Sequence, residues 1–370
     1  MHTSPAAGDA FVIRDKVSIY NTSIQSYGFA TLPSTEKHSN QPKFFLSYKG
    51  NMKNRDIKID LGAVQETLIL PLWARAKEME KKNPIVYDTY ARDIVARIDY
   101  DFSKIEAGQV ADHQIVWAIR AYNFDTIVKT FLTHNSNAVV VNIGAGLDTT
   151  FQRVDNGSVL WVNIDLPDVV ALRQKLIPDS EREMTIAKSV FDFSWMNDIA
   201  QQGCKFQIPN DQIPNKFQIS NTKQQTNKSC QGNKDFTGNF IAQQKKGRSI
   251  LFMAAGVLCY FKAQQVEIMF RKLADAYPSA NFIFDSFSWF TAWGTNREIM
   301  KDSGMDSSTI IKWHMKRASH LRKWVATIKV VEEYPMLSRV PVRNDLSKRM
   351  VWGLRIIGLF RLYNMVHVQF

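Results

Sequence analysis

A chain of 370 residues, of which 45% are hydrophobic and 22% charged, has an ordinary globular composition and is long enough for one large core or two modest domains. Its longest apolar run, residues 250–261, falls short of the roughly 20 residues of a membrane-spanning helix, so none is predicted. The first thirty residues lack a secretory signal pattern, and the three cysteines lack metal-site spacing; we therefore expect a cytoplasmic protein without disulfides or a bound metal.

The net charge of +12 is concentrated in one part of the chain. Residues 200–248 hold eight basic and two acidic residues, which is about half of the excess. Most of this stretch, residues 201–247, is crowded with Gln, Asn, Lys and Ser, so we interpret it as an insertion that loops out or is disordered. The rest of the chain is only mildly basic, so no nucleic-acid partner is expected; a docking or nucleic-acid role of the insertion is the alternative that composition leaves open.

The N-terminal third of the chain divides into a leader and a helical region. Residues 1–55 show no sustained period and are interpreted as a loosely ordered leader. Residues 63–82 have apolar positions at three-to-four spacing, which predicts a helix with one buried face that Pro71 is placed to kink. A second helix is predicted over residues 113–131, and together they make residues 56–135 an N-terminal helical cap.

The remainder, residues 136–370, is predicted to be an α/β core. Short apolar runs rich in β-branched and aromatic residues predict strands at residues 137–143, 159–164, 249–253, 281–285 and 327–331. Helical patterns such as residues 263–276 separate most of them, which favours a doubly wound, mostly parallel sheet that binds ligands at the carboxyl ends of its strands. Residues 351–370 are expected to add a final sheet segment, although a membrane contact is the alternative.

A glycine-containing turn follows the first predicted strand. In Gly144-Ala145-Gly146 the glycines allow a tight turn and bring backbone N–H groups close to a ligand. Asp165 lies about twenty residues further on, at the end of the next strand, where a carboxylate can accept hydrogen bonds from both ribose hydroxyls. Together these features indicate a ligand that contains adenosine.

Two ligand classes share this arrangement. Dinucleotide sites prefer a third glycine three positions after the second, where this chain has Thr149. Asp148 also places a carboxylate in the turn, which would repel a pyrophosphate and attract a sulfonium or amino group. The pattern therefore favours S-adenosylmethionine over a nicotinamide dinucleotide.

Several sequence blocks in the same order resemble the leucine carboxyl methyltransferase family, and particularly its bacterial branch of tetracenomycin-type polyketide O-methyltransferases. The resemblance runs from about Val64 to about Glu333, with the insertion excluded. The blocks are residues 66–75 (ETLILPLWAR), 97–102 (RIDYDF), 141–150 (VNIGAGLDTT), 163–169 (NIDLPDV) and 256–261 (GVLCYF). The resemblance implies a Rossmann-like, seven-stranded, mostly parallel class I methyltransferase fold with S-adenosyl-L-methionine as the methyl donor.

The same resemblance implies roles for individual residues. Arg120 matches the arginine that grips the methionine carboxylate, which suits a planar bidentate donor. Asp192 matches an acceptor for the adenine amino group, although an aspartate before residues 194–196 is also a favoured helix cap. Ala255 replaces the usual glutamate, so one carboxylate near the cofactor is missing. The expected cofactor-binding residues are Arg120, Asn142, Gly144, Ala145, Gly146, Asp148, Asp165, Leu166, Asp192 and Ala255.

No catalytic residue is assigned. Methyl transfer from a sulfonium requires mainly positioning, so a carboxylate acceptor needs no base; for a hydroxyl acceptor the candidates are His314, His320 and Tyr260. The aromatic residues Phe287, Trp289, Phe290 and Trp293 follow a predicted strand and either line an apolar acceptor pocket or belong to the core.

We therefore predict an S-adenosylmethionine-dependent O-methyltransferase that modifies a carboxyl or hydroxyl of a small molecule, such as a polyketide or another secondary metabolite. The alternatives are a protein C-terminal carboxyl methyltransferase, a catalytically degenerate nucleotide-binding protein of the same fold, and a nicotinamide-dependent oxidoreductase. No membrane partner is expected, and the sequence does not determine the oligomeric state.

Overall fold

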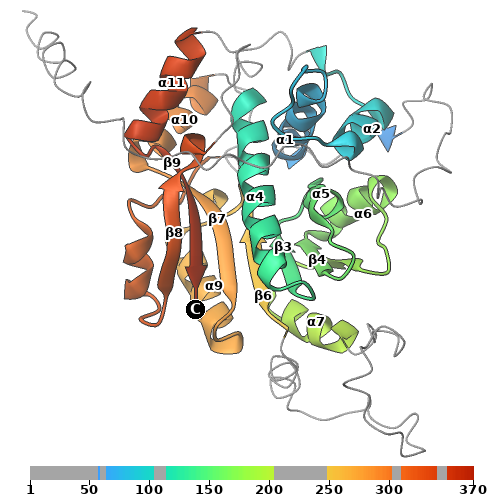
Figure 1. Ribbon diagram of the computed structural model, residues 1–370, viewed down its shortest axis with the longest axis vertical. Helices are drawn as coiled ribbons and strands as arrows, with labels where there is room; N and C mark the ends of the chain where they lie inside the picture. The colour runs from blue at the N-terminus through green and yellow to red at the C-terminus, as the bar shows by residue number, and fades with distance from the viewer. Residues whose placement is uncertain (1–56, 59–63, 104–113, 204–247, 302–309, 340–347) are drawn as a thin grey trace, which may run out of the picture. The chain divides into compact units, whose positions relative to one another are not determined.

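The computed structural model describes residues 57–58, 64–103, 114–203, 248–301, 310–339 and 348–370 (Figure 1). The predicted leader up to residue 56 and most of the predicted insertion lie outside these residues. The first part of that insertion, residues 201–203, is helical and ends α7 (Trp195–Gly203).

Seven strands form one mixed sheet. They are β3 (Val139–Ile143), β4 (Leu160–Asp165), β5 (Glu183–Ala187), β6 (Ile250–Ala254), β7 (Asn281–Phe287), β8 (Lys329–Pro335) and β9 (Tyr363–Gln369). Their order is β5-β4-β3-β6-β7-β9-β8, with β9 antiparallel to both of its neighbours and the other pairs parallel. This is the seven-stranded, mostly parallel, Rossmann-like sheet that the sequence predicts.

Helices cover both faces of the sheet, so its central strands are apolar on both sides. One face packs against α7, α9 (Ala263–Ala276) and the 3₁₀ helix η7 (Ala318–Lys323). The other packs against α4 (Gln114–His134), α5 (Thr150–Val154) and the 3₁₀ helix η8 (Met336–Ser338). The neighbouring β6 residues Phe252 and Met253 are both fully buried. Phe252 packs on the first of these faces and Met253 on the second.

The N-terminal helices form a separate cap above the carboxyl ends of the strands (Figure 1). Helices α1 (Val64–Glu78) and α2 (Thr89–Arg97) share an apolar cluster with α6 (Pro167–Leu176), and a short parallel pair joins β1 (Ile57–Lys58) to β2 (Ile98–Asp99). Helix α4, assigned to the cap from the sequence, packs on the sheet as well as on α1. The described residues accordingly belong to one compact unit.

The remaining elements depart from the sequence analysis mainly at the C-terminal end. After β7 the chain forms α10 (Trp289–Lys301), and the tail begins with a helix, α11 (Lys348–Leu359), before the expected final strand β9. A 3₁₀ turn, η5 (Leu258–Tyr260), follows β6. In the part of the chain that the structure describes, no helix has the length and apolar character needed to cross a bilayer.

Candidate functional site

A cleft lies where the order of the strands reverses. From β3 the chain moves outward to β4 and β5, then returns to the other side of β3 with β6. In doubly wound sheets, ligands bind at this switch point, beside the carboxyl ends of the strands. The cleft has a volume of about 190 Å³ and is lined by the loops after β3, β4 and β6, with α1 and α4 on the cap side.

The loop after β3 turns as the sequence predicts. Gly144 and Gly146 have φ angles of 66° and 49°, which favour glycine, and the Gly144 N–H donates to the carbonyl of Ile164 at 2.8 Å. A Cβ on Gly144 would lie 2.6 Å from a methyl of Val257, and one on Gly146 would lie 2.6 Å from a methyl of Leu68. Neither glycine can therefore be replaced without displacing a cleft wall.

Asp165 ends β4 directly opposite this loop. Its Oδ2 accepts from the Gly146 N–H at 2.6 Å, and its Oδ1 accepts from the Leu166 N–H at 2.7 Å. Burial raises the pKa of this carboxyl, although the two N–H donors act in the opposite direction. The carboxylate is thus fixed at the cleft, with lone pairs left for further donors.

Asn142 and Asp148 form the floor of the cleft. The Asn142 amide donates to Asp148 Oδ2 at 3.0 Å, and the hydroxyl of Thr150 donates to Asp148 Oδ1 at 2.9 Å. Arg153 lies 3.9 Å from the same carboxylate. These contacts hold the negative charge of Asp148 at the carboxyl end of β3, where the sequence places it.

Arg120 enters the cleft from α4, and a network that the sequence analysis missed holds it there. Its Nη1 lies 4.0 Å from Oδ2 of Asp285, the residue near the end of β7, and Asp285 also accepts from the Tyr363 hydroxyl and from the Gly256 N–H at 2.6 Å. Burial lowers the pKa of Arg120, but Tyr363 and Asp285 outweigh it and raise the pKa, so the guanidinium stays charged. Gly256, at φ 70°, leaves no room for a Cβ, which would lie 2.2 Å from Arg120 Nη1.

Ala255 lines the cleft beside Arg120 and adds no charge. The carboxylate that the family pattern places at this position is therefore absent, and Asp285 on the neighbouring strand is the acid next to Arg120. Asp285 could have been found from the sequence, because it is a charged residue at the end of a predicted buried strand, directly after Phe282-Ile283-Phe284.

A second buried network joins the cap to the loop after β3. Asp88, which is fully buried before α2, accepts from Arg75 at 2.8 Å, from Thr149 at 2.6 Å and from Arg153 at 2.8 Å. Arg75, on α1, also donates to the carbonyl of Leu147 at 3.0 Å. Thr149 thus stands where dinucleotide sites prefer a third glycine, and its side chain is hydrogen-bonded to Asp88 of the cap.

Nine of the ten residues predicted to bind the cofactor line this one cleft: Arg120, Asn142, Gly144, Ala145, Gly146, Asp148, Asp165, Leu166 and Ala255. The exception is Asp192, which is exposed and is not among the lining residues. Its Oδ1 accepts from the Ser194 N–H at 3.1 Å, just before α7, and hydrogen bonds with Ser194 lower the pKa of its carboxyl. This geometry is that of the alternative, a cap before residues 194–196.

The three candidate bases occupy different places. Tyr260 lines the cleft, but burial raises the pKa of its hydroxyl, which disfavours the phenolate that a base requires. His314 and His320 are exposed and line a separate, larger cavity beside α10. The structure therefore supplies no base at the cleft from among these three residues.

The aromatic residues after β7 divide between core and surface. Phe287 stacks on Tyr363 with ring centroids 4.4 Å apart and packs against the core. Trp289 and Phe290 line the larger cavity, whereas the exposed Trp293 stacks against Trp289. In this segment Phe287 thus belongs to the core, whereas Trp289 and Phe290 line a cavity.

Comparison with known proteins supplies the class of protein. The family model described as leucine carboxyl methyltransferase matches residues 69–274. The tetracenomycin polyketide synthesis O-methyltransferase TcmP of Streptomyces glaucescens is 26% identical over 308 residues, which cover 82% of this chain and 95% of that protein. The S-adenosyl-L-methionine-dependent methyltransferase dpfgK of Gibberella zeae is 28% identical over 153 residues, 38% of this chain and 51% of that one. Among solved structures, a DUF574 family protein from Streptomyces avermitilis has a TM-score of 0.46 and 12% identity, covering 80% of this chain and 96% of that one.

Proposed function

This chain belongs to the leucine carboxyl methyltransferase family, and we propose that it transfers the methyl group of S-adenosylmethionine to an oxygen of a small molecule. The similarity to a polyketide O-methyltransferase extends over 82% of the chain and 95% of that relative, which supports oxygen as the acceptor atom and a small molecule as its carrier. The similarity to an S-adenosyl-L-methionine-dependent enzyme supports the donor.

One observation carries the donor site: the glycine turn, Asp165 and Arg120 converge on a single cleft at the switch point of the sheet. They come from three separate elements, β3, β4 and α4, and their chemistry matches three parts of one ligand. The lack of side chains at Gly144 and Gly146 suits close approach of the nucleoside, the carboxylate suits ribose hydroxyls, and the guanidinium suits the carboxylate of the amino acid.

The donor set fits S-adenosylmethionine better than a dinucleotide. Asp148 places a fixed negative charge at the cleft floor, which favours a sulfonium or an ammonium and disfavours a pyrophosphate. The cleft volume of about 190 Å³ is below the roughly 300 Å³ of common ligand pockets, and the side chains of Leu68 and Val257 lie against the two glycines. We infer that these two side chains move when the donor enters.

The protein contributes positioning to the reaction. Bound S-adenosylmethionine would supply an electrophilic methyl group on a sulfonium; an oxygen nucleophile would attack its carbon in line, and the sulfur would leave as a neutral thioether. Arg120 and Asp165 would hold the methionine carboxylate and the ribose, on the two sides of the sulfonium, so its methyl group would be presented in a fixed direction. A carboxylate acceptor reacts without a protein base, which agrees with the raised pKa of Tyr260 at the cleft.

Calorimetric titration tests the donor site. We expect S-adenosylmethionine and S-adenosylhomocysteine to bind the wild type and NADH not to bind. Arg120→Ala and Asp165→Ala should each weaken binding of S-adenosylhomocysteine by at least about tenfold, since each removes a charge-assisted hydrogen bond. The matched controls are Arg92→Ala and Asp275→Ala, exposed residues of the same types that do not line the cleft.

Two results would contradict the proposal. Binding of NADH in place of the sulfur nucleosides would revive the oxidoreductase alternative. Binding of the nucleosides without methyl transfer to any of a broad panel of carboxylic acids and phenols would favour the degenerate, non-catalytic alternative.

A further inference from the structure

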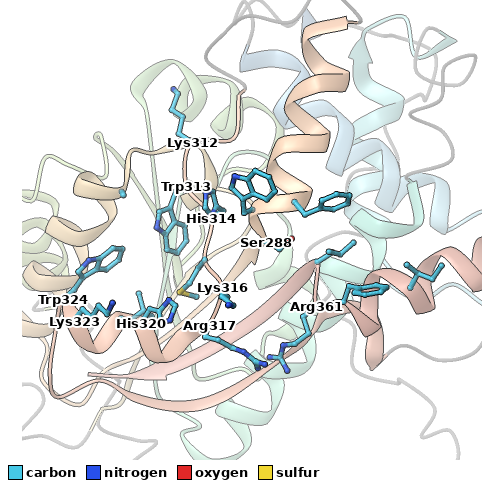
Figure 2. Close-up of a pocket in the computed structure, with 18 residues that line it drawn as sticks. Ser288, Lys312, Trp313, His314, Lys316, Arg317, His320, Lys323, Trp324 and Arg361 are labelled. Carbon is cyan, nitrogen blue, oxygen red and sulfur yellow. The ribbon is translucent and has the colours of Figure 1, made fainter. Parts of the chain in front are cut away.

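A second, larger cavity lies beside the donor cleft. Its volume is about 1120 Å³, and it is bounded by the start of α10, residues 312–317, η7, and the end of α11 with the residues that follow it, 360–362 (Figure 2). This volume is slightly above the range of about 300–1,000 Å³ for small-molecule sites. None of the ten residues predicted to bind the donor lines it.

The lining of the cavity is cationic. It includes Lys312, Lys316, Arg317, Lys323 and Arg361, and no aspartate or glutamate appears among the described lining residues. Arg361 is 3.2 Å from Glu333, whereas within the described part of the chain the other four side chains make no ion pair. Clustered cations without counter-charges attract an anion and raise its local concentration. The positive charge of the lining therefore favours an anionic ligand.

Aromatic side chains supply the apolar part of the wall. Trp289 and Phe290 are 63% and 57% exposed, although large aromatic residues are normally packed. Trp313 and Trp324 also line the cavity, with ring centroids 6.3 Å apart and planes inclined by 33° (Figure 2). Flat aromatic surfaces beside cations favour a planar ring system that carries negative charge.

Buried polar atoms beneath this region have no partner of their own. Ser286 and Asn364 are both 2% exposed and face each other across β7 and β9, yet Ser286 Oγ and Asn364 Oδ1 make no hydrogen bond within the described residues. Ser286 belongs to β7, and Ser288, which lines the cavity, follows the end of that strand. Nε of Arg361, also in the lining, is similarly unpaired. Such atoms are costly to bury, and of the three residues only Arg361 lines the cavity.

The cavity and the donor cleft share a wall. The backbone N–H groups of Lys312 and Trp313 donate to the carbonyl of Cys259 at 2.7 and 3.0 Å, and the next residue, Tyr260, lines the donor cleft. Phe261 lines the cleft and Ala263 lines the cavity. The loop after β6 thus borders both spaces.

From these observations we propose that the cavity binds a planar aromatic anion, such as an aromatic carboxylate, and that this anion is the methyl acceptor. The acceptor role rests on the proposed function, whereas binding of the anion does not. In the reaction an oxygen lone pair of the anion forms the new bond to the methyl carbon, the carbon–sulfur bond breaks, and its electron pair remains on sulfur. The products are a neutral methyl ester or ether and S-adenosylhomocysteine.

Binding is tested by calorimetry with 2-naphthoate and with its neutral analogue 2-naphthamide. We expect the wild type to prefer 2-naphthoate by about tenfold or more, and the double variant Lys316→Gln/Arg317→Gln to lose most of that preference. Lys272→Gln, which removes an exposed cation of α9 that does not line the cavity, should behave as wild type. Equal affinity for acid and amide, or no difference between the double variant and the Lys272 control, would overturn the cavity as an anion site.

The acceptor role is tested with a panel of one- to three-ring aromatic carboxylates and phenolates and S-adenosylmethionine labelled in its methyl group. Labelled ester or ether that falls in the Lys316→Gln/Arg317→Gln variant, while its affinity for S-adenosylhomocysteine is unchanged, would support it. Charge-dependent binding without labelled product from any panel member would overturn the acceptor role. If S-adenosylhomocysteine binds but 2-naphthoate does not, the cavity proposal fails while the donor site stands; the reverse result leaves the anion site and overturns the proposed function.

Discussion

At the residue scale, the site depends on charges held by partners from distant parts of the chain. Arg120 lies on α4 and Asp285 on β7, and the two meet only because β7 follows β6 in the sheet. The sequence identified Arg120 through its resemblance to a family pattern, but not Asp285. The pairing depends on tertiary packing, which no local pattern reports.

Replacing Asp285 with asparagine should reveal this coupling. The guanidinium of Arg120 would remain largely buried without its carboxylate, so we expect the free energy of unfolding to fall by about 3 kcal/mol. A double-mutant cycle with Arg120→Met, measured by urea unfolding, should give the combined variant a smaller loss than the two single losses added together. Strict additivity would show that the two side chains are not coupled.

The affinity for the donor should depend on the ionisation of Asp165. Burial raises the pKa of this carboxyl, and only the charged form can accept from both ribose hydroxyls. The affinity for S-adenosylhomocysteine should therefore start to fall, on acidification, at a higher pH than the value of about 4 typical of an exposed aspartate. Calorimetry as a function of pH tests this, with Asp165→Asn expected to bind weakly and without that dependence. An identical pH profile for both proteins would exclude Asp165 as the titrating group.

At the element scale, the buried hub at Asp88 determines how the cap meets the glycine turn. Arg75, on α1, donates to the carbonyl of Leu147. Thr149 and Arg153, at the start of α5, both donate to the carboxylate of Asp88. These contacts connect elements separated by about sixty residues in the chain. The cap is therefore fixed to the loop that lines the donor cleft.

Asp88→Asn should destabilise the protein by about 3 kcal/mol at pH 7, because Arg75 would stay buried without a carboxylate partner, whereas Arg153 keeps its ion pair with Asp125. Burial favours a higher pKa for Asp88, but Arg153 and Arg75 outweigh it and the pKa is lowered. The stabilisation is thus present above about pH 4 and is lost as the pH falls through the lower value in the folded protein. Urea unfolding at neutral and acidic pH measures it.

Asp93→Asn, which alters the more exposed aspartate paired with Arg92 on the same helix, is the control. It should change the unfolding free energy by about 1 kcal/mol or less. A loss for Asp88→Asn that is no larger than that of this control would contradict the hub.

At the scale of the whole molecule, the fold was largely predictable because the central strands carry their own signal. The runs at β3, β4, β6 and β7 are apolar on both faces, and α9 begins and ends as predicted. Strand β5 had no assigned range, because this edge strand, Glu183-Met-Thr-Ile-Ala, is only partly buried and lacks a continuous apolar run. The order of the strands, and hence the meeting of Arg120, Asp165 and Gly144 in one cleft, follows from the fold and not from local sequence.

The larger cavity beside α10 likewise could not be predicted from local sequence. Trp289 and Phe290 follow a strand, so the sequence left pocket and core equally open for them. Their partners in the wall come from η7 and from the residues before β9, more than twenty positions away. The sequence therefore indicated candidate pocket residues but not the cationic side chains that complete the wall.

The measurement that tests the central claim most directly is a crystal structure of the protein with S-adenosylhomocysteine bound. We predict that the amino-acid carboxylate of the ligand contacts the guanidinium of Arg120, and that the ribose hydroxyls contact Asp165, with Leu68 and Val257 displaced from the two glycines. A nucleoside bound elsewhere, or bound in the cleft without contacting Arg120 and Asp165, would contradict the account.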